Sequence, residues 1–227
     1  MDKGIKKNTC GFVLTIQVIM FCALGFISAA VNQGLCVQAD NVLLPQDITP
    51  PFDGPVKYPF TKNDAIKCGH WRSASQDYPY FGAPRSGNTR KHAGIDLYPA
   101  KGVGTPIKAI GDGKVIKVAP FYTRRNGEVT YAVLVDHNDF VANYAELKKP
   151  SLSPGSIIKQ KQIIGVLSGT RQLHVELYMP GTKNWSSWIG SKMPANLIDP
   201  TDMMIRIFST KDNDRSSCGD EKYPQNK

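Results

Sequence analysis

The stretch that decides the fold is "KHAGIDLYPAKGVGTPIKAIGDGKVIKV", residues 91–118. Within it, "TPIKAI" and "GKVIKV" alternate apolar and polar residues, as strands with one buried face do. Gly111, Asp112 and Gly113 join them, and glycine tolerates the positive φ that tight hairpin turns require. The pattern therefore predicts an antiparallel hairpin at this point.

Strand-like segments continue along the chain. "VTYAVLVDH" and "DFVANYAEL" (129–147) are separated by a turn at residues 137–139, and "SIIKQ", "QIIGVLS" and "LHVELYM" follow. No segment carries a sustained helical period. We therefore predict an all-β domain over residues 66–207, made of short antiparallel strands folded into a sandwich or open barrel.

The N-terminal residues have the composition of a targeting segment. Three lysines precede an uncharged apolar run over residues 11–30, and small or polar residues follow. This predicts a signal peptide over residues 1–39, cut after Ala30 or Ala39, and hence a secreted, periplasmic or cell-surface protein with no membrane span after cleavage. A retained membrane anchor is the alternative, because the run is nearly long enough to cross a bilayer.

Two further segments flank the predicted domain. Residues 40–65 contain five prolines and predict an extended arm, whereas residues 208–227 are almost free of aliphatic side chains and predict a polar tail. Cys68 and Cys218 bracket the domain. In an oxidising compartment such a pair predicts a disulfide that ties the two ends together.

The charge of the chain favours anionic partners. The net charge is +9, and removing residues 1–39 takes away three lysines and one aspartate, which leaves +7. Such a surplus favours cell-wall polymers, lipid head groups, glycans or nucleic acid. Export makes nucleic acid the least favoured of these, and the sequence does not indicate an oligomeric state.

The chain contains only four histidines, at positions 70, 92, 137 and 174. His92 and Asp96 are four residues apart, a spacing that would turn both side chains to one face of an extended strand. His174 lies on another predicted strand, whose alternate residues are apolar. Imidazole and carboxylate are good zinc donors, and catalytic zinc usually takes three protein ligands. A lone His-x-x-x-Asp pair is nevertheless more often a surface hydrogen bond.

The motifs around these residues resemble a known family. "KHAGIDLYPAKGVGTPIKAIGDGKVIKV" is similar to the H-x-G-x-D segment and the following strands of lysostaphin-type and LytM-like peptidoglycan metalloendopeptidases. "VLVDHNDFVANYAEL" resembles the strand pair of that family that ends in Tyr-x-His-Leu, and "QLHVELY" resembles its His-x-His strand. The resemblance implies a Zn²⁺ site formed by His92, Asp96 and His174, and cleavage of peptide cross-links in peptidoglycan.

The resemblance fails at two catalytic positions. In that family two further histidines flank the metal; this chain has Glu146 in place of one and Gln172 in place of the other. Glutamine does not change its protonation state at neutral pH and brings no positive charge to a developing oxyanion. Loss of a general acid or base costs about 10²–10⁴-fold in rate, so the hydrolysis typical of the family should be weak or absent.

Glu146 allows three interpretations. It could be a solvated residue near the rim, a fourth ligand that makes the zinc structural, or a general base toward water. The last leaves the oxyanion poorly supported.

Three functions follow from these expectations. The first is an exported zinc-binding domain that binds peptidoglycan, or another anionic cell-surface polymer, with little or no hydrolysis. The second is an active zinc metalloendopeptidase that uses Glu146 as base. The third is a secreted basic signalling or adhesion protein with structural zinc. "CGHWRSASQDYPYFGAPRSGNTRKHAGIDL" and "LIDPTDMM" support it, because they loosely resemble leukocyte cell-derived chemotaxin, a relative that keeps the zinc ligands and lacks the catalytic histidines.

Overall fold

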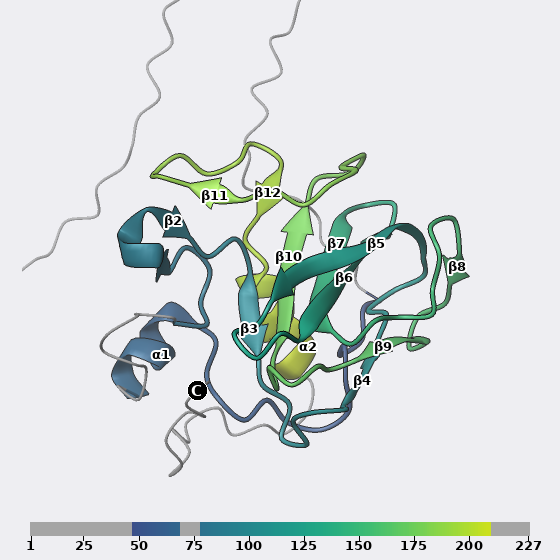
Figure 1. Ribbon diagram of the computed structural model, residues 1–227, viewed down its shortest axis with the longest axis horizontal. Coiled ribbons are helices and arrows are strands. Elements are labelled where there is room, and N and C mark those ends of the chain that lie inside the picture. Colours follow the sequence, from purple (N-terminus) through teal and green to yellow (C-terminus); the bar gives the residue numbers. More distant parts are fainter. Residues whose placement is uncertain (1–46, 69–77, 210–227) are drawn as a thin grey trace, which may run out of the picture. The chain divides into compact units, whose positions relative to one another are not determined.

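A computed structural model of the chain describes residues 47–68 and 78–209 (Figure 1). The all-β class is confirmed, because all strand pairings in these residues are antiparallel. The strands are β1 (Pro84–Arg85), β2 (Arg90–Lys91), β3 (Ile95–Leu97), β4 (Pro106–Lys108), β5 (Gly113–Thr123), β6 (Val129–Asp136), β7 (Val141–Leu147), β8 (Ile157–Ile158), β9 (Ile163–Val166), β10 (Leu173–Tyr178), β11 (Trp188–Ile189) and β12 (Leu197–Ile198). The helices are α1 (Lys62–Cys68), the short 3₁₀ turn η1 (Ser86–Asn88) and α2 (Thr201–Ser209).

The largest sheet is built around β10. Its strands run in the order β12-β10-β7-β6-β5-β8, and β3 pairs with β10 on the same edge as β12. Smaller sheets join β1, β2 and β11, and β4 with β9. Because β10 pairs with β3 on one edge and with β7 on the other, the first residues of β10 lie between these two strands. The predicted metal site lies there.

The side chains of β10 alternate between two environments. Leu173, Val175 and Leu177 belong to the main hydrophobic core, as the sequence predicts. Side chains on successive residues of a strand point to opposite faces. His174 and Glu176 therefore share the other face, and they are buried there as well.

Of the two predicted hairpins, one is confirmed and one is wrong. β6 and β7 pair along their length. β4 and β5 do not pair: β4 pairs with β9, and β5 with β6 and β8. The reason lies at Asp112, whose carbonyl contacts Nδ1 of His137 at 2.8 Å and whose carboxylate accepts hydrogen bonds from Gln160 N and Lys159 Nζ, both at 2.8 Å. These contacts hold the connection open instead of closing a tight turn.

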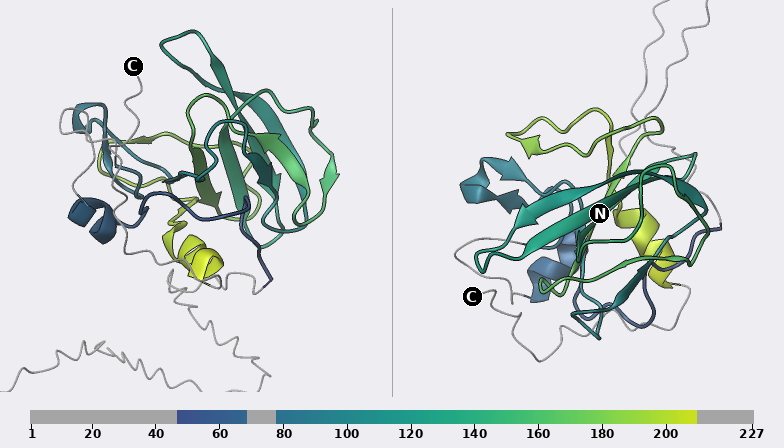
Figure 2. Two further views of the ribbon diagram at one scale, coloured as in Figure 1. Left: turned by 90° about the horizontal axis from the view of Figure 1, so that it is seen from below. Right: turned by 45° about the vertical axis from the view of Figure 1, so that its right-hand side comes forward.

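The helix α2 was not predicted, although it completes the core. Its nine residues are too few to show a sustained helical period. The Asp199 carboxylate accepts a hydrogen bond from the N–H of Thr201 at the start of the helix, at 2.9 Å. Figures 1 and 2 show α2 against one face of the curved sheet, and its apolar side chains belong to the main core, namely Met203, Met204, Ile207 and Phe208.

The segment before α1 lies on this domain. The rings of Phe52 and Phe60 pack against Phe208, with centroids 5.4 and 6.3 Å apart. The backbone N–H of Thr49 donates to the carbonyl of Ile110 at 2.9 Å. The boundary expected between residues 65 and 66 falls inside α1, and the start of the expected tail at residue 208 falls inside α2.

Several expectations fall outside the described residues. The predicted signal peptide and Cys218 belong to this group. Cys68 is disulfide-bonded. The other four cysteines lie outside the described residues, so the pairing of Cys68 with Cys218 stays a prediction. Among residues 47–68 and 78–209, none of the helices is long and apolar enough to span a bilayer.

Candidate metal centre

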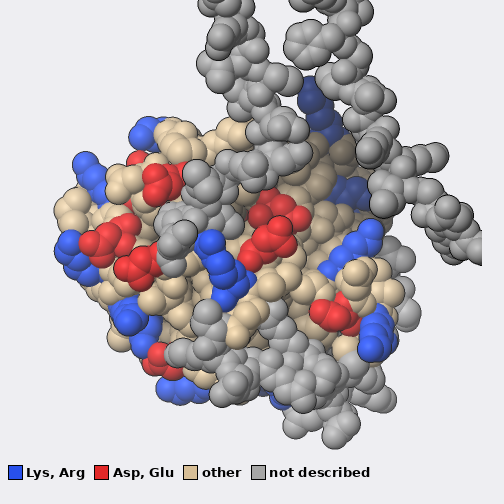
Figure 3. Space-filling model, turned by 180° about the vertical axis from the view of Figure 1, so that it is seen from behind, with Lys and Arg blue, Asp and Glu red and all other residues tan. Residues whose placement is uncertain are grey.

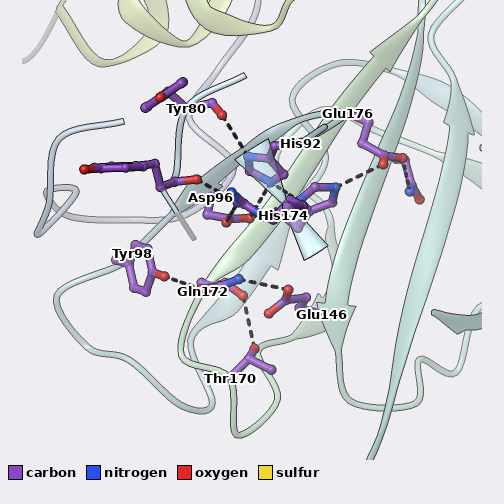
Figure 4. Close-up of polar contacts among 12 residues, drawn as sticks. Tyr80, His92, Asp96, Tyr98, Glu146, Thr170, Gln172, His174 and Glu176 are labelled. Carbon is purple, nitrogen blue, oxygen red and sulfur yellow. Dashed lines mark hydrogen bonds and ion pairs between the residues drawn. The ribbon is translucent and has the colours of Figure 1, made fainter. Parts of the chain in front are cut away.

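The structure brings together the three residues that the sequence predicts as zinc ligands. Asp96 lies on β3 directly opposite His174 on β10, and His92 lies just after β2 (Figure 4). His92 and Asp96 do not share one extended strand, as their spacing had suggested, because the chain bends at Ala93 and Gly94.

Gly94 is what allows this bend to reach β10. A Cβ atom at this position would lie 2.1 Å from the carbonyl oxygen of Val175. No side chain fits at such a distance, so the backbone of residue 94 must approach β10 as glycine. The close approach places His92 and Asp96 on either side of it, next to His174.

The three side chains form what we call the donor cluster: His92, Asp96 and His174. His92 Nε2 lies 3.2 Å from Asp96 Oδ1 and 3.0 Å from His174 Nδ1, and His174 Nδ1 lies 2.9 Å from Asp96 Oδ1. Ligand atoms at the usual zinc distance and tetrahedral angles would be ~3.4 Å apart. The spacing of the cluster is thus close to that of a zinc site, and all three residues are buried.

The outer nitrogen of each histidine has a partner that fixes the ring. The backbone carbonyl of Tyr80 lies 2.9 Å from His92 Nδ1 and can only accept a hydrogen bond there. Glu176 Oε1 lies 3.0 Å from His174 Nε2. Such partners orient metal-binding histidines and set which nitrogen faces the metal. Here they leave His92 Nε2 and His174 Nδ1 facing Asp96.

Asp96 and Glu176 both have their outer carboxylate oxygen occupied. Arg85 donates to Asp96 Oδ2 at 3.3 Å and to the carbonyl of Tyr78 at 2.6 Å. Glu176 Oε2 accepts hydrogen bonds from Asn143 Nδ2 at 2.7 Å and from the Tyr178 hydroxyl at 2.9 Å. Hydrogen bonds of this kind favour the charged form of a carboxylate.

The pKa values follow from these contacts. Burial opposes ionisation of Asp96, but His92 and His174 outweigh it and hold the pKa of Asp96 below its usual range. Burial likewise opposes a charge on His174, yet Asp96 and Glu176 raise the pKa of His174 to about 10. Burial lowers the pKa of His92 to about 4. Because a metal ligand must be neutral imidazole, a metal ion would have to displace the proton that these carboxylates hold on His174.

Glu146 and Gln172 lie beside the donor cluster and bind each other (Figure 4). Gln172 Nε2 donates to Glu146 Oε1 at 2.9 Å, and the Tyr98 hydroxyl donates to Gln172 Oε1. Glu146 has a φ of +69° at an irregularity in the pairing of β7 with β6, and it is buried rather than solvated. Its other oxygen, Oε2, has no hydrogen-bond partner among the described residues.

The position of Glu146 bears on its three interpretations. A solvated residue at the rim is wrong, because only 5% of Glu146 is exposed. In the part of the chain that is described, the group of candidate ligand atoms within 4.8 Å of one another contains His92, Asp96 and His174 and does not include Glu146. Burial, followed by the negative charge of Asp96, raises the pKa of Glu146 to about 7.

His137, the other histidine among the described residues, does not lie at this centre. His137 lies at the β6–β7 turn, buried, with Nδ1 at 2.8 Å from the carbonyl of Asp112 and Nε2 at 3.0 Å from the Tyr144 hydroxyl. These contacts make it a structural residue of the turn. His70 lies outside the described residues.

Sequence reasoning missed several partners of the donor cluster. Arg85 contacts Asp96 of the cluster directly, whereas Tyr98 contacts Gln172 and Asn143 contacts Glu176 beside it. These contacts come from three different segments, and the sequence did not indicate them. Glu176 and Tyr178 follow His174 at intervals of two, so the alternation of β10 could have identified them.

Comparison with known proteins identifies a family match and several relatives of the chain. Residues 90–185 match the sequence profile of peptidase family M23. The chain is 37% identical over 103 residues to the peptidoglycan DD-endopeptidase ShyC of Vibrio cholerae, covering 43% of this chain and 22% of that protein. It is 29% identical over 130 residues to an uncharacterized metalloprotease of Buchnera aphidicola, covering 55% of this chain and 31% of that protein. The chain thus spans between a fifth and a third of the length of these relatives.

Among solved structures, the chain is similar to the catalytic domain of the antimicrobial peptidase lysostaphin from Staphylococcus simulans. The identity is 20%, the match covers 64% of this chain and 98% of that domain, and the TM-score is 0.36. The matched profile covers all three residues of the donor cluster as well as Glu146 and Gln172. Over residues 90–185 the chain therefore matches peptidase family M23, the family of lysostaphin and LytM.

Proposed function

We propose that the domain holds a zinc ion through His92, Asp96 and His174, binds peptidoglycan, and hydrolyses it weakly or not at all. Peptidases of family M23 are zinc metallopeptidases. Two imidazole nitrogens and one carboxylate oxygen suit zinc, and three protein ligands leave one coordination position open. When bound, zinc acts as a Lewis acid and lowers the pKa of water.

The observation that carries the weak-hydrolysis proposal is the Glu146–Gln172 pair. The amide of Gln172 donates to Glu146, and its carbonyl oxygen accepts from Tyr98. Both ends of the side chain are therefore engaged, and neither residue brings a positive charge toward an oxyanion. Removing one oxyanion donor costs about 10²–10³-fold in rate.

The choice of peptidoglycan rests on the relative and on the charge. ShyC is a peptidoglycan DD-endopeptidase, and this chain carries a net charge of +9. Basic and acidic side chains are interspersed on the face shown in Figure 3, so that face offers no purely basic surface for a polyanion. Export through residues 1–39 would place the protein outside the cytoplasm, at the cell surface or in the periplasm.

An active endopeptidase is the second candidate, because one observation favours it. Glu146 Oε2 is buried without a hydrogen-bond partner among the described residues, and burial raises the pKa of Glu146 to about 7. A general base works best when its pKa lies near the operating pH. In this alternative Glu146 takes the proton from the attacking water.

The test is incubation of the purified protein with peptidoglycan sacculi. Wild type should sediment with the sacculi, contain one zinc per chain, and release few peptide amines. Glu146→His combined with Gln172→His should increase the release by about 10²–10⁴-fold, because it restores both histidines. Lys149→His, on an exposed residue, is the matched control and should change nothing.

Two results would contradict the proposal. Rapid release by wild type that is lost in Glu146→Ala would establish the active endopeptidase. Failure of wild type to sediment with sacculi would remove peptidoglycan as the ligand, whatever the zinc content.

A further inference from the structure

A chain of hydrogen bonds leads away from the donor cluster on the back of His174. Glu176 Oε1 contacts His174 Nε2 at 3.0 Å, the Tyr178 hydroxyl donates to Glu176 Oε2 at 2.9 Å, and the backbone N–H of Ser186 donates to the Tyr178 hydroxyl at 2.9 Å. His174, Glu176 and Tyr178 alternate along β10 and share one face. The chain thus connects a predicted metal ligand to the loop after β10.

We propose that Tyr178 is a positioning residue whose hydroxyl couples the donor cluster to the loop of residues 179–187. This inference rests on the zinc binding proposed above. The hydroxyl holds Glu176, which holds His174 with Nδ1 toward the metal, and the same hydroxyl holds the loop through Ser186.

The hydroxyl is suited to this role because its two hydrogen bonds have a fixed direction. A backbone N–H can only donate, and an ionised carboxylate can only accept. The hydroxyl therefore accepts from Ser186 and donates to Glu176. Burial raises the pKa of Tyr178, so its proton is retained at neutral pH. Without the hydroxyl, Glu176 keeps Asn143 and His174 as partners but loses its third hydrogen bond.

The loop forms part of the surroundings of the predicted metal centre. Trp185 lies on it, with its ring 6.2 Å from that of Phe121, and the Phe121 ring lies 5.4 Å from that of His174. Lys117 Nζ lies 4.2 Å from the centre of the Trp185 ring. A ligand that contacts Trp185 would therefore act on a loop that is connected to His174 through Tyr178 and Glu176.

The experiment compares two tyrosine-to-phenylalanine variants. Tyr178→Phe removes the proposed coupling group. Tyr144→Phe is the matched control, because Tyr144 is equally buried and its hydroxyl also accepts a backbone N–H, that of Ile110 at 3.1 Å, but contacts His137 in place of Glu176. Zinc affinity is measured by chelator competition, and hydrogen exchange is measured at the Ser186 amide.

The Tyr178→Phe variant should bind zinc about tenfold more weakly, the lower end of the effect of outer partners of metal ligands. Its Ser186 amide should exchange about fivefold faster, as expected for loss of one hydrogen bond. The Co²⁺-substituted variant should show a shifted visible spectrum, which a loss of general stability would not produce. Tyr144→Phe should match wild type in all three measurements.

The outcomes separate the coupling from the zinc site. Wild type that binds zinc, with Tyr178→Phe binding equally tightly, overturns the coupling alone. Wild type that binds no zinc overturns the proposed function and the coupling together. If Tyr178→Phe does not fold, wild type decides: the Ser186 amide should exchange more slowly with zinc than without it, and an unchanged rate overturns the coupling.

Discussion

Two buried histidines of this domain have similar local surroundings but different chemistry. His137 Nε2 contacts the Tyr144 hydroxyl directly, and His174 Nε2 is connected to the Tyr178 hydroxyl through Glu176. Both hydroxyls accept a backbone N–H. His137 has two neutral partners, the carbonyl of Asp112 and the hydroxyl of Tyr144. His174 lies between two carboxylates, Asp96 and Glu176. Carboxylate neighbours, rather than burial, distinguish the predicted metal ligand from the structural histidine.

The largest effect is expected from Gly94 beside the donor cluster, with Gly111 near His137 as its control. Gly94→Ala would place a Cβ 2.1 Å from the carbonyl oxygen of Val175 and should destabilise the protein by ~4 kcal/mol. Gly111→Ala meets Nδ1 of His137 at 3.6 Å, an ordinary contact, and should cost below ~1 kcal/mol. Urea unfolding measures both. Equal losses would mean that the approach to β10 imposes no special constraint.

The second effect concerns the histidines themselves. His174→Ala removes one of the three proposed ligands and should weaken zinc binding by more than ~100-fold, beyond the range of outer partners. His137→Ala should lower the unfolding free energy and leave zinc affinity unchanged. Chelator competition and urea unfolding of both variants give the comparison, and tight zinc binding by His174→Ala would refute the ligand assignment.

The third effect concerns the carboxylates. Glu176→Ala should weaken zinc binding by about 10–100-fold, because His174 loses the group that orients it. Asp112→Ala is the control at the other histidine, since the exposed carboxylate of Asp112 contacts Lys159 and Gln160 instead of an imidazole. Zinc affinity of this control should equal that of wild type; a decrease like that of Glu176→Ala would indicate indirect loss through folding.

The smallest effect is a pH dependence from His137. Burial lowers the pKa of His137 below its usual value, so the unfolded chain binds a proton more readily than the folded one. The stabilisation is complete above the unfolded pKa of about 6.5 and is lost as the pH falls below it toward the folded pKa. His137→Gln should flatten this part of the curve of unfolding free energy against pH. An unchanged slope would show that other groups dominate.

Sequence patterns predicted the parts of the domain that depend on contacts between residues close together in the chain. The β6–β7 hairpin and the alternation of β10 were visible in the sequence, and the family motif marked the donor cluster. The expected β4–β5 hairpin failed because Asp112 is held by residues distant in the chain. Arg85 and Tyr98 reach the centre only after folding, and no short-range pattern carries that information.

The unusual backbone of Glu146 has a consequence for the side chains that its position can carry. A φ of +69° is uncommon for glutamate, whereas histidine adopts the left-handed region several-fold more readily than most residues. The backbone at this position therefore accepts histidine at least as easily as it accepts Glu146. Exchanging Glu146 for histidine would then require no change in the course of the backbone.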